Sequence, residues 1–383
     1  MDMIRTAQFK YDSKELRAVK EVFASGWLVH HDKGKEFEEK IAKLHHKNYG
    51  VAVCSATEGL YLAVRALSFK IGTVLAPAMT FVSTVNCATR NGHNVRLYDI
   101  KSERDLNADF EDIKRKYTDD VVGVVVVHYG GHICEDINKI AAFCKEKGIF
   151  LIEDCAHAIG STSFGYYAGH WGDASVFSFH ATKTLAIGEG GMVITDSDVV
   201  SKKIRCMREI GRIADEIRKY DVIIPSGKCA MTEYQCAIGL VQLEKLAGFR
   251  KHLSKLGRTY MYGCLNIAGL TVPFARDYLN SDTTVYNFTV ILPVDVNREE
   301  IQTFLKMKNI ETTVEYQPIY RLALYTEHQK YTFPKIQVIE KRLLTLPVNV
   351  CMTLTDVKYV CEMLNYAITK NRGHNGNNRL PKL

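Results

Sequence analysis

Short apolar runs alternate with amphipathic segments between residues 50 and 152. The runs are GVAV (50–53), TVLA (73–76), VRLYDI (95–100), VVGVVVVHY (121–129) and IFLIE (149–153). Strands in which nearly every residue is apolar, separated by helices, are typical of a parallel sheet covered on both faces. We therefore predict a doubly wound α/β core. Its ligand site should lie at the carboxyl ends of the strands.

Amphipathic helices precede this core, and a different pattern follows it. The first helix is predicted over 13–25, where Asp12 is placed to cap it and Glu15 completes a capping box. A second helix is predicted over 35–46. The later part of the chain has the pattern of a small α+β domain, with a strand at 287–293, a helix at 297–309, a strand at 310–316 and a last helix at 353–368.

The length of 383 residues is sufficient for two domains. We expect a large domain at 1–247, a small C-terminal domain at 248–370 and a disordered tail at 371–383. The segment from Lys370 to Lys382 supplies four positive charges and no acid, so only +3 of the net charge of +7 belongs to the rest of the chain. A chain without a pervasive basic surface is not expected to bind nucleic acid.

Hydrophobicity and cysteine spacing indicate the compartment. No apolar run approaches the length of about eighteen residues that suggests a membrane span, and the N-terminus is too charged for a signal peptide. The eleven cysteines are scattered, with neither a CxxC pair nor zinc-like spacing. These features predict a cytoplasmic protein with reduced thiols, no metal site and no membrane partner.

The stretch from Ile149 to Met192 carries the strongest chemical pattern. The strand IFLIE runs into Asp154, and a second strand, ASVFSF, is followed by Lys183 and by GEGG. A single lysine is usually a surface charge, and an aspartate after a strand is often a turn residue. Together they suit pyridoxal phosphate, which needs a lysine for its Schiff base and often an aspartate at the ring nitrogen. Partial burial would help Lys183 to attack a carbonyl, because burial disfavours the ammonium form.

Other residues could complete such a site. Ser55 and Thr57 begin a helix after GVAV, where free amides and the helix dipole favour a phosphate, although the same residues could form a plain N-cap. Ser178 could add a hydroxyl. Phe81 could stack on a planar ring or lie in the core, and His157 could bind a ring oxygen or be a core histidine. Neither a Walker A motif nor a GxGxxG is present, which counts against nucleoside triphosphate and dinucleotide cofactors.

Taken together, these segments resemble the DegT/DnrJ/EryC1/StrS family of sugar aminotransferases that depend on pyridoxal phosphate. The matching pieces are CSATEGLYLAV, PAMTFVST, IEDCAHAIGS, FSFHATKTLAIGEGG and MTEYQCAIGLVQLEKL. The likeness extends from the first helix to about residue 368. It implies the fold-type I architecture of such enzymes, with a mostly parallel seven-stranded sheet between helices and a small C-terminal α+β domain. It also implies a homodimer with shared active sites.

The resemblance implies a role for each matching residue. Lys183 would form the Schiff base, and Asp154 would pair with the pyridinium nitrogen. His157 would contact the ring hydroxyl, and Phe81 would stack on the ring. The phosphate would be held by Ser55, Ala56, Thr57 and Ser178.

The chain departs from the family pattern just before Met231. The family usually has an asparagine there, which reaches the phosphate of the other subunit, and a basic residue. A gapless match places Lys228 and Ala230 at these positions. Lys228 could still reach the phosphate of the partner subunit as a point charge. On the same likeness, Trp27 and Tyr316 would lie near the nucleotide of the substrate.

The expected activity is transfer of an amino group from L-glutamate to a keto group of a nucleotide-linked deoxysugar, at C4 rather than C3. Relatives that dehydrate sugars have histidine in place of Lys183, so the lysine favours transamination. One alternative is the same fold acting on a cyclitol or an eight-carbon keto acid, or as a sugar dehydratase. Another is a sensor or scaffold without turnover, against which the intact lysine and aspartate speak.

Overall fold

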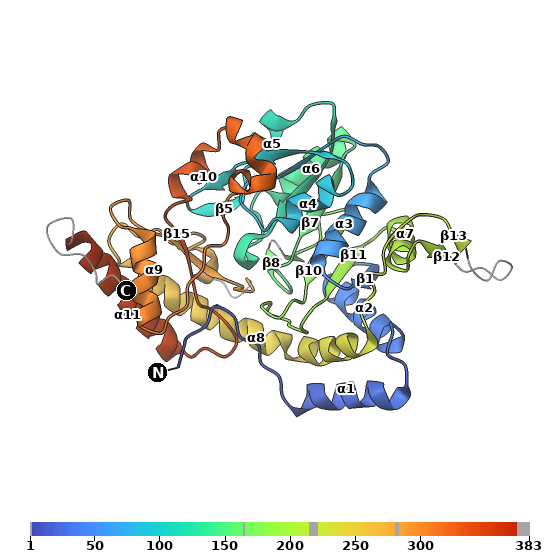
Figure 1. Cartoon of the computed structure of the whole chain (residues 1–383), viewed down its shortest axis with the longest axis horizontal. Helices are drawn as coiled ribbons and strands as arrows, with labels where there is room; N and C mark the ends of the chain where they lie inside the picture. The colour runs from blue at the N-terminus through green and yellow to red at the C-terminus, as the bar shows by residue number, and fades with distance from the viewer. Residues whose placement is uncertain (1, 164, 214–220, 280–282, 374–383) are drawn as a thin grey trace.

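The centre of the molecule is a seven-stranded sheet, as the resemblance implies. The computed structural model describes residues 2–163, 165–213, 221–279 and 283–373 (Figure 1). The strand order is β1-β11-β10-β7-β6-β2-β3. The strands are β1 (Tyr49–Val53), β11 (Gly191–Thr195), β10 (Ala174–Ser178), β7 (Phe150–Asp154), β6 (Val121–Val127), β2 (Thr73–Pro77) and β3 (Asn94–Tyr98). In the described part of this sheet β11 alone runs antiparallel to its neighbours. The predicted α/β core is confirmed.

Side chains that alternate along the strands divide the large core into two layers. Val51 and Val53 of β1 face one layer, and Ala52 faces the other. One layer packs on the helices α3 (Ala56–Leu67) and α7 (Asp198–Arg208), and the other on α2 (Asp32–Leu44), α5 (Phe110–Lys116) and α6 (Ile137–Lys147). Helices therefore cover both faces of the sheet (Figure 1).

A 33-residue helix, α8 (Glu233–Leu265), runs beneath the sheet and joins it to the C-terminal part (Figure 1). Near its start α8 packs on α2 and on α1 (Ser13–Ser25), and it also packs on α11 (Leu354–Gly373). The helix crosses residue 248, where the sequence pattern changes. Beyond it lie β14 (Phe288–Ile291), α9 (Arg298–Met307), α10 (Pro334–Ile339) and β15 (Leu343–Leu346).

The remaining elements are short. The helix α4 (Ser83–Thr89) lies between β2 and β3. Three two-stranded hairpins are β4–β5 (Ile100–Ser102, Asp105–Ala108), β8–β9 (Thr162–Ser163, Tyr166–Tyr167) and β12–β13 (Arg212–Ile213, Asp221–Val222). Single 3-10 turns are η1 (Tyr129–Gly131), η2 (Asp277–Leu279), η3 (Ile319–Arg321) and η4 (Ala323–Lys330). In the part of the chain that the structure describes, no helix is both long and apolar enough to cross a membrane.

Two predicted elements differ from the structure, and the predicted tail is only partly described. The second helix begins at Asp32 because the Glu233 carboxylate, from α8, accepts hydrogen bonds from the amides of His31 (2.6 Å) and Gly34 (3.1 Å) at its start. The predicted strand at 310–316 is wrong, since its central part forms only an isolated bridge with β15. Residues 371–373 form the end of α11, and the rest of the predicted tail lies outside the described residues.

Candidate active site

The carboxyl ends of the parallel strands lie at one edge of the sheet, and most of the predicted site residues lie there. β7 ends at Asp154, β10 ends at Ser178, and β1 is followed by Ser55 at the start of α3. β2 leads to Phe81. The antiparallel strand β11 begins at this edge with Gly191, which is paired with Ser178. Residues far apart in the sequence thus converge on the place where doubly wound sheets bind ligands.

The start of α3 forms a cradle with free amide groups. Ser55 caps the helix through its Oγ, which accepts a hydrogen bond from the Glu58 amide at 3.2 Å. The amides of Ala56 and Thr57 lie in the first turn, where N–H groups have no partner within the helix. A Cβ on Gly191 would lie 2.6 Å from the Ala56 nitrogen, so any side chain there would press on the cradle.

Three further hydroxyl groups belong to this region. The Thr57 hydroxyl is 2.8 Å from that of Ser83, at the start of α4. The Ser178 hydroxyl, at the end of β10, accepts a hydrogen bond from the His180 amide at 3.4 Å. Ser83 was not among the predicted residues, although it lies in the segment PAMTFVST quoted for Phe81. Helix amides and small hydroxyls are the donors that bind phosphate groups.

Asp154 is a buried carboxyl group on the α3 and α4 side of the sheet. It accepts hydrogen bonds from the Thr84 hydroxyl at 2.8 Å and from the Ala156 amide at 3.1 Å. Burial raises the pKa of Asp154, and these hydrogen bonds only partly oppose it. Thr84 was also missed, because its contact depends on how α4 packs against β7. A buried carboxyl group with two donors is well placed to meet a cationic ring nitrogen.

His157 is held by three neighbours. Its Nδ1 accepts a hydrogen bond from the Gly130 amide at 3.3 Å, and its Nε2 is 2.9 Å from the Tyr316 hydroxyl. Its ring stacks on that of Tyr286, with centroids 4.0 Å apart and planes 21° apart. Burial, followed by the positive charge of Lys183, lowers the pKa of His157 well below its usual range. His157 is therefore a neutral imidazole.

Lys183 presents its amine to an aromatic face. Its Nζ lies 4.1 Å from the centroid of the Tyr286 ring. Its charge also acts on Asp154 and His157. Tyr286 could not be predicted as a site residue, because nothing in the sequence around it indicates that the chain after α8 passes this edge of the sheet. The lysine, the aspartate and the histidine form one electrostatic cluster.

Phe81 and Tyr316 form an aromatic wall of the same site. The Phe81 ring is 54% exposed, and its centroid lies 5.9 Å from that of Tyr316 at an interplanar angle of 56°. An exposed aromatic face at the edge where the parallel strands end suits a flat heterocycle. Tyr316 lies next to His157, so the residue assigned to the substrate contacts one assigned to the cofactor.

Trp27 and Lys228 make their contacts elsewhere. Trp27 is 57% exposed and stacks on His31 with ring centroids 4.5 Å apart. Lys228 is exposed, and its ammonium pairs with the Glu209 carboxylate. Arg208 lies nearby in the sequence, and its guanidinium is buried against the Glu38 carboxylate at 2.5 Å.

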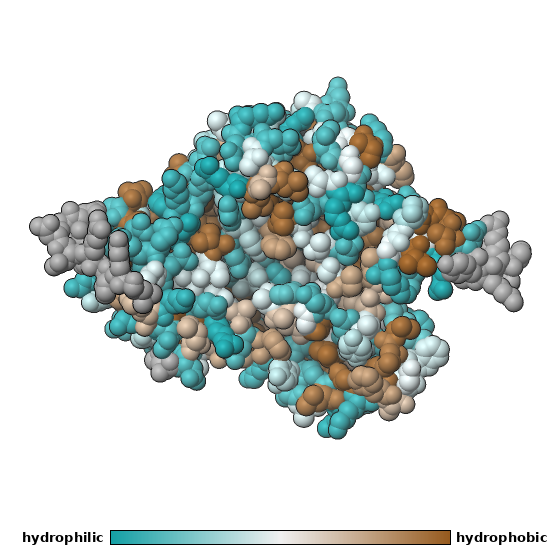
Figure 2. All heavy atoms as spheres, in the orientation of Figure 1, coloured by the Kyte–Doolittle hydropathy of each residue, from teal (hydrophilic) through white to brown (hydrophobic). Residues whose placement is uncertain are grey.

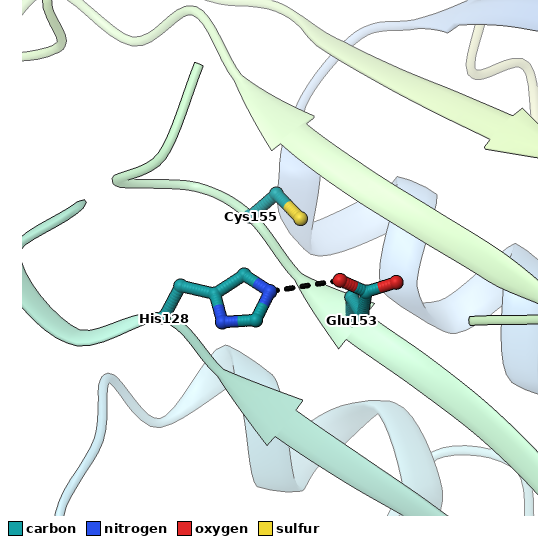
Figure 3. Close-up of side chains that lie close together, drawn as sticks. All are labelled: His128, Glu153 and Cys155. Atoms are coloured by element: carbon teal, nitrogen blue, oxygen red, sulfur yellow. Dashed lines mark hydrogen bonds and ion pairs between the residues drawn. The ribbon is translucent and has the colours of Figure 1, made fainter. Parts of the chain in front are cut away.

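A second cluster on the opposite side of β7 has the composition of a metal site. His128 and Glu153 are joined at 2.8 Å, with the Cys155 sulfur nearby (Figure 3). The Glu153 carboxylate also accepts hydrogen bonds from the Trp171 amide at 2.7 Å and the Gly169 amide at 3.0 Å. Burial raises the pKa of the Cys155 thiol, and the Glu153 carboxylate has its hydrogen bonds filled by groups of the protein itself. The cluster is therefore a support that holds the loop before β10.

The donor set at the strand ends fits pyridoxal phosphate. A buried carboxyl group suits the ring nitrogen, and an exposed phenylalanine suits the ring face. The helix amides with their hydroxyls suit the phosphate, and the lysine amine suits the aldehyde. Because Gly191 has no side chain, the phosphate cradle stays open; a larger residue would cover it.

Comparisons with known proteins identify the family. The model of the DegT/DnrJ/EryC1/StrS aminotransferase family matches residues 10–365. The spore coat polysaccharide biosynthesis protein SpsC of Bacillus subtilis is 34% identical over 91% of this chain and 93% of its own length. The GDP-perosamine synthase of Vibrio cholerae is 31% identical over 95% of this chain and 99% of its own length.

Solved structures have the same fold. The aminotransferase TlmJ from Streptoalloteichus hindustanus aligns with a TM-score of 0.89 at 28% identity, covering 96% of this chain and 99% of its own. DesI, crystallised in the presence of its TDP-sugar product, aligns with a TM-score of 0.89 at 25% identity, covering 97% and 95%.

Proposed function

This chain belongs to the DegT/DnrJ/EryC1/StrS aminotransferase family, and we propose that it uses pyridoxal phosphate to move an amino group from L-glutamate to the C4 keto group of a nucleotide-linked deoxysugar. The observation that carries the chemistry is the cluster of Lys183, buried Asp154 and the free amides of α3 at one sheet edge. The substrate class is supported by the relatives, which include GDP-perosamine synthases and a protein with a TDP-sugar product.

Each part of the cofactor has a group of this chain to hold it. Asp154 would bind the ring nitrogen, Phe81 would stack on the ring, and Lys183 would bond to the aldehyde carbon. The phosphate would be held by Ser55, Ala56, Thr57 and Ser178, with Ser83 beside them. When bound, the cofactor supplies an electron sink for the carbanion formed at the amino-acid α-carbon.

The protein's own groups position the reactants and move the proton. The Lys183 amine would act as the base that takes the proton from the α-carbon of the donor and delivers it to the C4′ carbon of the cofactor. Burial raises the pKa of Asp154, and a cationic ring nitrogen placed against it would favour its ionised form. The neutral His157 adds no second positive charge.

The proposal includes a homodimer with shared sites. Apolar side chains stand exposed on α1 and on the loop after it, and Figure 2 shows apolar atoms gathered over this part of the molecule. The exposed residues are Leu16, Phe23, Trp27, Leu28 and Val29. A contiguous apolar patch of this kind commonly marks a protein interface. In such a dimer Trp27 and Tyr316 would contact the substrate, and Lys228 of the partner subunit would approach the phosphate.

A cofactor and substrate screen tests the function. The purified protein should take up pyridoxal phosphate and absorb visible light, and glutamate should bleach that absorbance. A panel of nucleotide-linked keto sugars, with a cyclitol ketone and an eight-carbon keto acid as competitors, is then read by product mass. Lys183→Ala should lower turnover by at least about a thousandfold. If the wild type takes up no cofactor, or if the variant retains its turnover, the proposal is wrong.

A further inference from the structure

Two cysteines from distant parts of the chain meet beside the phosphate cradle. Cys54 follows β1 and directly precedes Ser55, the N-cap residue of α3. Cys229 lies in the segment between β13 and α8. The Cys54 amide donates a hydrogen bond to the Cys229 carbonyl oxygen at 2.6 Å, and the two thiols are hydrogen-bonded to each other. The two residues therefore face one another directly.

The backbone of Cys229 is held from both sides. Its amide donates a hydrogen bond at 2.9 Å to the carbonyl oxygen of Arg208, the last residue of α7, while its own carbonyl oxygen is bonded to Cys54. Backbones joined in this way bring two Cα atoms to about 5–6 Å, which is a separation that a disulfide spans. A bond between the two sulfurs is therefore compatible with the fold.

The two sulfur atoms differ in their chemistry. The hydrogen bond from the Cys229 thiol lowers the pKa of Cys54 to about 7, so a large share of Cys54 is thiolate at neutral pH. The same hydrogen bond, followed by burial, raises the pKa of Cys229, which keeps its proton. Cys54 is also partly exposed, whereas Cys229 is buried. An accessible thiolate beside a second thiol is the arrangement that redox-sensing cysteines have.

We propose that Cys54 and Cys229 form a reversible disulfide when the protein meets a peroxide, and that this bond weakens the binding of a phosphate group at the start of α3. Formation of the bond depends on the two thiols alone, whereas its effect on the cofactor rests on the proposed function. Sulfurs in hydrogen-bond contact lie farther apart than the length of about 2 Å of a disulfide, so oxidation must draw Cys54 toward Cys229. Ser55 and the amides of Ala56 and Thr57 follow Cys54 in the chain, so they are displaced with it.

The oxidation takes two electrons from the sulfurs and gives them to the peroxide. The Cys54 thiolate attacks one oxygen of hydrogen peroxide, so that an S–O bond forms, the O–O bond breaks and hydroxide leaves. The Cys229 sulfur then attacks the Cys54 sulfur and displaces a second hydroxide. The Glu58 carboxylate accepts a hydrogen bond from the Cys229 thiol at 3.8 Å and is placed to take its proton. With the two thiol protons, the peroxide becomes two waters.

A mass measurement on the cofactor-free protein tests the bond. Stoichiometric hydrogen peroxide at pH 7 should link the peptide that contains Cys54 to the peptide that contains Cys229, and dithiothreitol should separate them again. Cys264 and Cys361 are the matched control. Their sulfurs lie 3.9 Å apart, but the hydrogen bond between them and burial raise the pKa of Cys264, so this pair should stay reduced. Absence of the link between Cys54 and Cys229, or equally fast linkage of the control pair, would overturn the inference.

The effect on the cradle is measured as the affinity for pyridoxal phosphate. The oxidised wild type should bind it about tenfold more weakly than the reduced protein, and dithiothreitol should restore the affinity. Cys54→Ser cannot form the bond, so its affinity should be the same before and after peroxide treatment. A linked wild-type protein that binds the cofactor as tightly as the reduced protein would overturn the effect on the cradle. A reduced wild-type protein that binds no cofactor would instead refute the proposed function, while the link would still be detected by mass.

Discussion

Asp154 is expected to lower stability while it serves catalysis. Burial raises its pKa, so ionising Asp154 costs more free energy in the folded protein than in the unfolded chain. Asp154→Asn should therefore raise the free energy of unfolding of the cofactor-free protein by about 1 kcal/mol at neutral pH. It should also lower kcat at least about a hundredfold, because an amide cannot balance a cationic ring nitrogen.

The pH dependence of this effect has a defined sign. A carboxyl group whose pKa is raised on folding reduces stability as pH rises above its unfolded value. The gain in Asp154→Asn should thus grow as pH rises above about 4 and disappear below it, where the carboxyl group is protonated in both states. Urea unfolding at a series of pH values measures it. A variant that is less stable than the wild type at pH 7 would contradict the prediction.

Cys54 is predicted to be the most reactive thiol at neutral pH. It lies beside the phosphate cradle, and its interaction with the Cys229 thiol lowers its pKa to about 7. Cys351 is more exposed, but burial of its sulfur raises its pKa. One equivalent of iodoacetamide at pH 7 should therefore modify Cys54 first, as read by peptide mass. Bound phosphate should slow the reaction, and preferential labelling of Cys351 would refute the assignment.

The sequence indicates some residues of the site better than others. Asp154, Ser178 and Ser55 could be predicted because each follows directly from a recognisable strand. Thr84 and Tyr286 could not, since their roles come from tertiary contacts between segments far apart in the chain. The hydrogen bond to Nδ1 of His157 also could not be predicted, because the Gly130 amide that donates it comes from a different loop.

Glu38 ties α2 and α7 to the first strand of the sheet. Its carboxylate forms ion pairs with Arg208 at 2.5 Å and Arg205 at 2.6 Å. It also accepts a hydrogen bond from the Ala52 amide at 2.9 Å. Burial alone would raise its pKa, but the hydrogen bond from His30 and the two arginine charges lower it to about 2. The ionised Glu38 therefore stabilises the fold, and the unfolded chain lacks this stabilisation.

Glu38→Gln should lower the free energy of unfolding by about 3 kcal/mol at pH 7. A depressed pKa contributes stability above the unfolded pKa of about 4.5, and the contribution is lost as pH falls toward 2. The difference between variant and wild type should therefore shrink across that range. Glu36→Gln is the control on the same helix, because its pair with Lys40 is exposed and should change stability by less than about 0.5 kcal/mol. Equal effects of the two variants would contradict the prediction.

Strands and helices could be predicted where one short stretch of sequence determines them. The first helix has the predicted bounds because Asp12 and Glu15 form the expected capping box. The start of α2 could not be predicted, since Glu233, its capping residue, lies on α8. The predicted strand at 310–316 failed because the segment forms only isolated bridges, at Ile310 with Ile4 and at Thr313 with β15. The hydrophobic periodicity of a segment depends on that segment alone, so it carries no information about partners that are distant in the sequence.

One predicted cofactor contact, that of Lys228, would be made by a second subunit. Lys228 pairs with Glu209 in its own chain, and its side chain is 60% exposed. The apolar residues on α1 are open to a second copy. Two-fold dimers place the same surface of each subunit against the other, so a residue near the interface can serve the partner's site. This geometry makes a test with mixed subunits possible.

Subunits carrying Lys183→Ala and subunits carrying Lys228→Ala should complement each other. In a mixed dimer, one site would lack both lysines, while the other would combine the intact Lys183 of one subunit with the intact Lys228 of its partner. After denaturation and refolding of an equal mixture, about a quarter of wild-type activity should return, because about half of the dimers are mixed and each has one intact site. Each variant refolded alone is the control and should stay far less active. If Lys228 served its own subunit, no mixed dimer would contain an intact site, and the mixture would be no more active than the average of its parts.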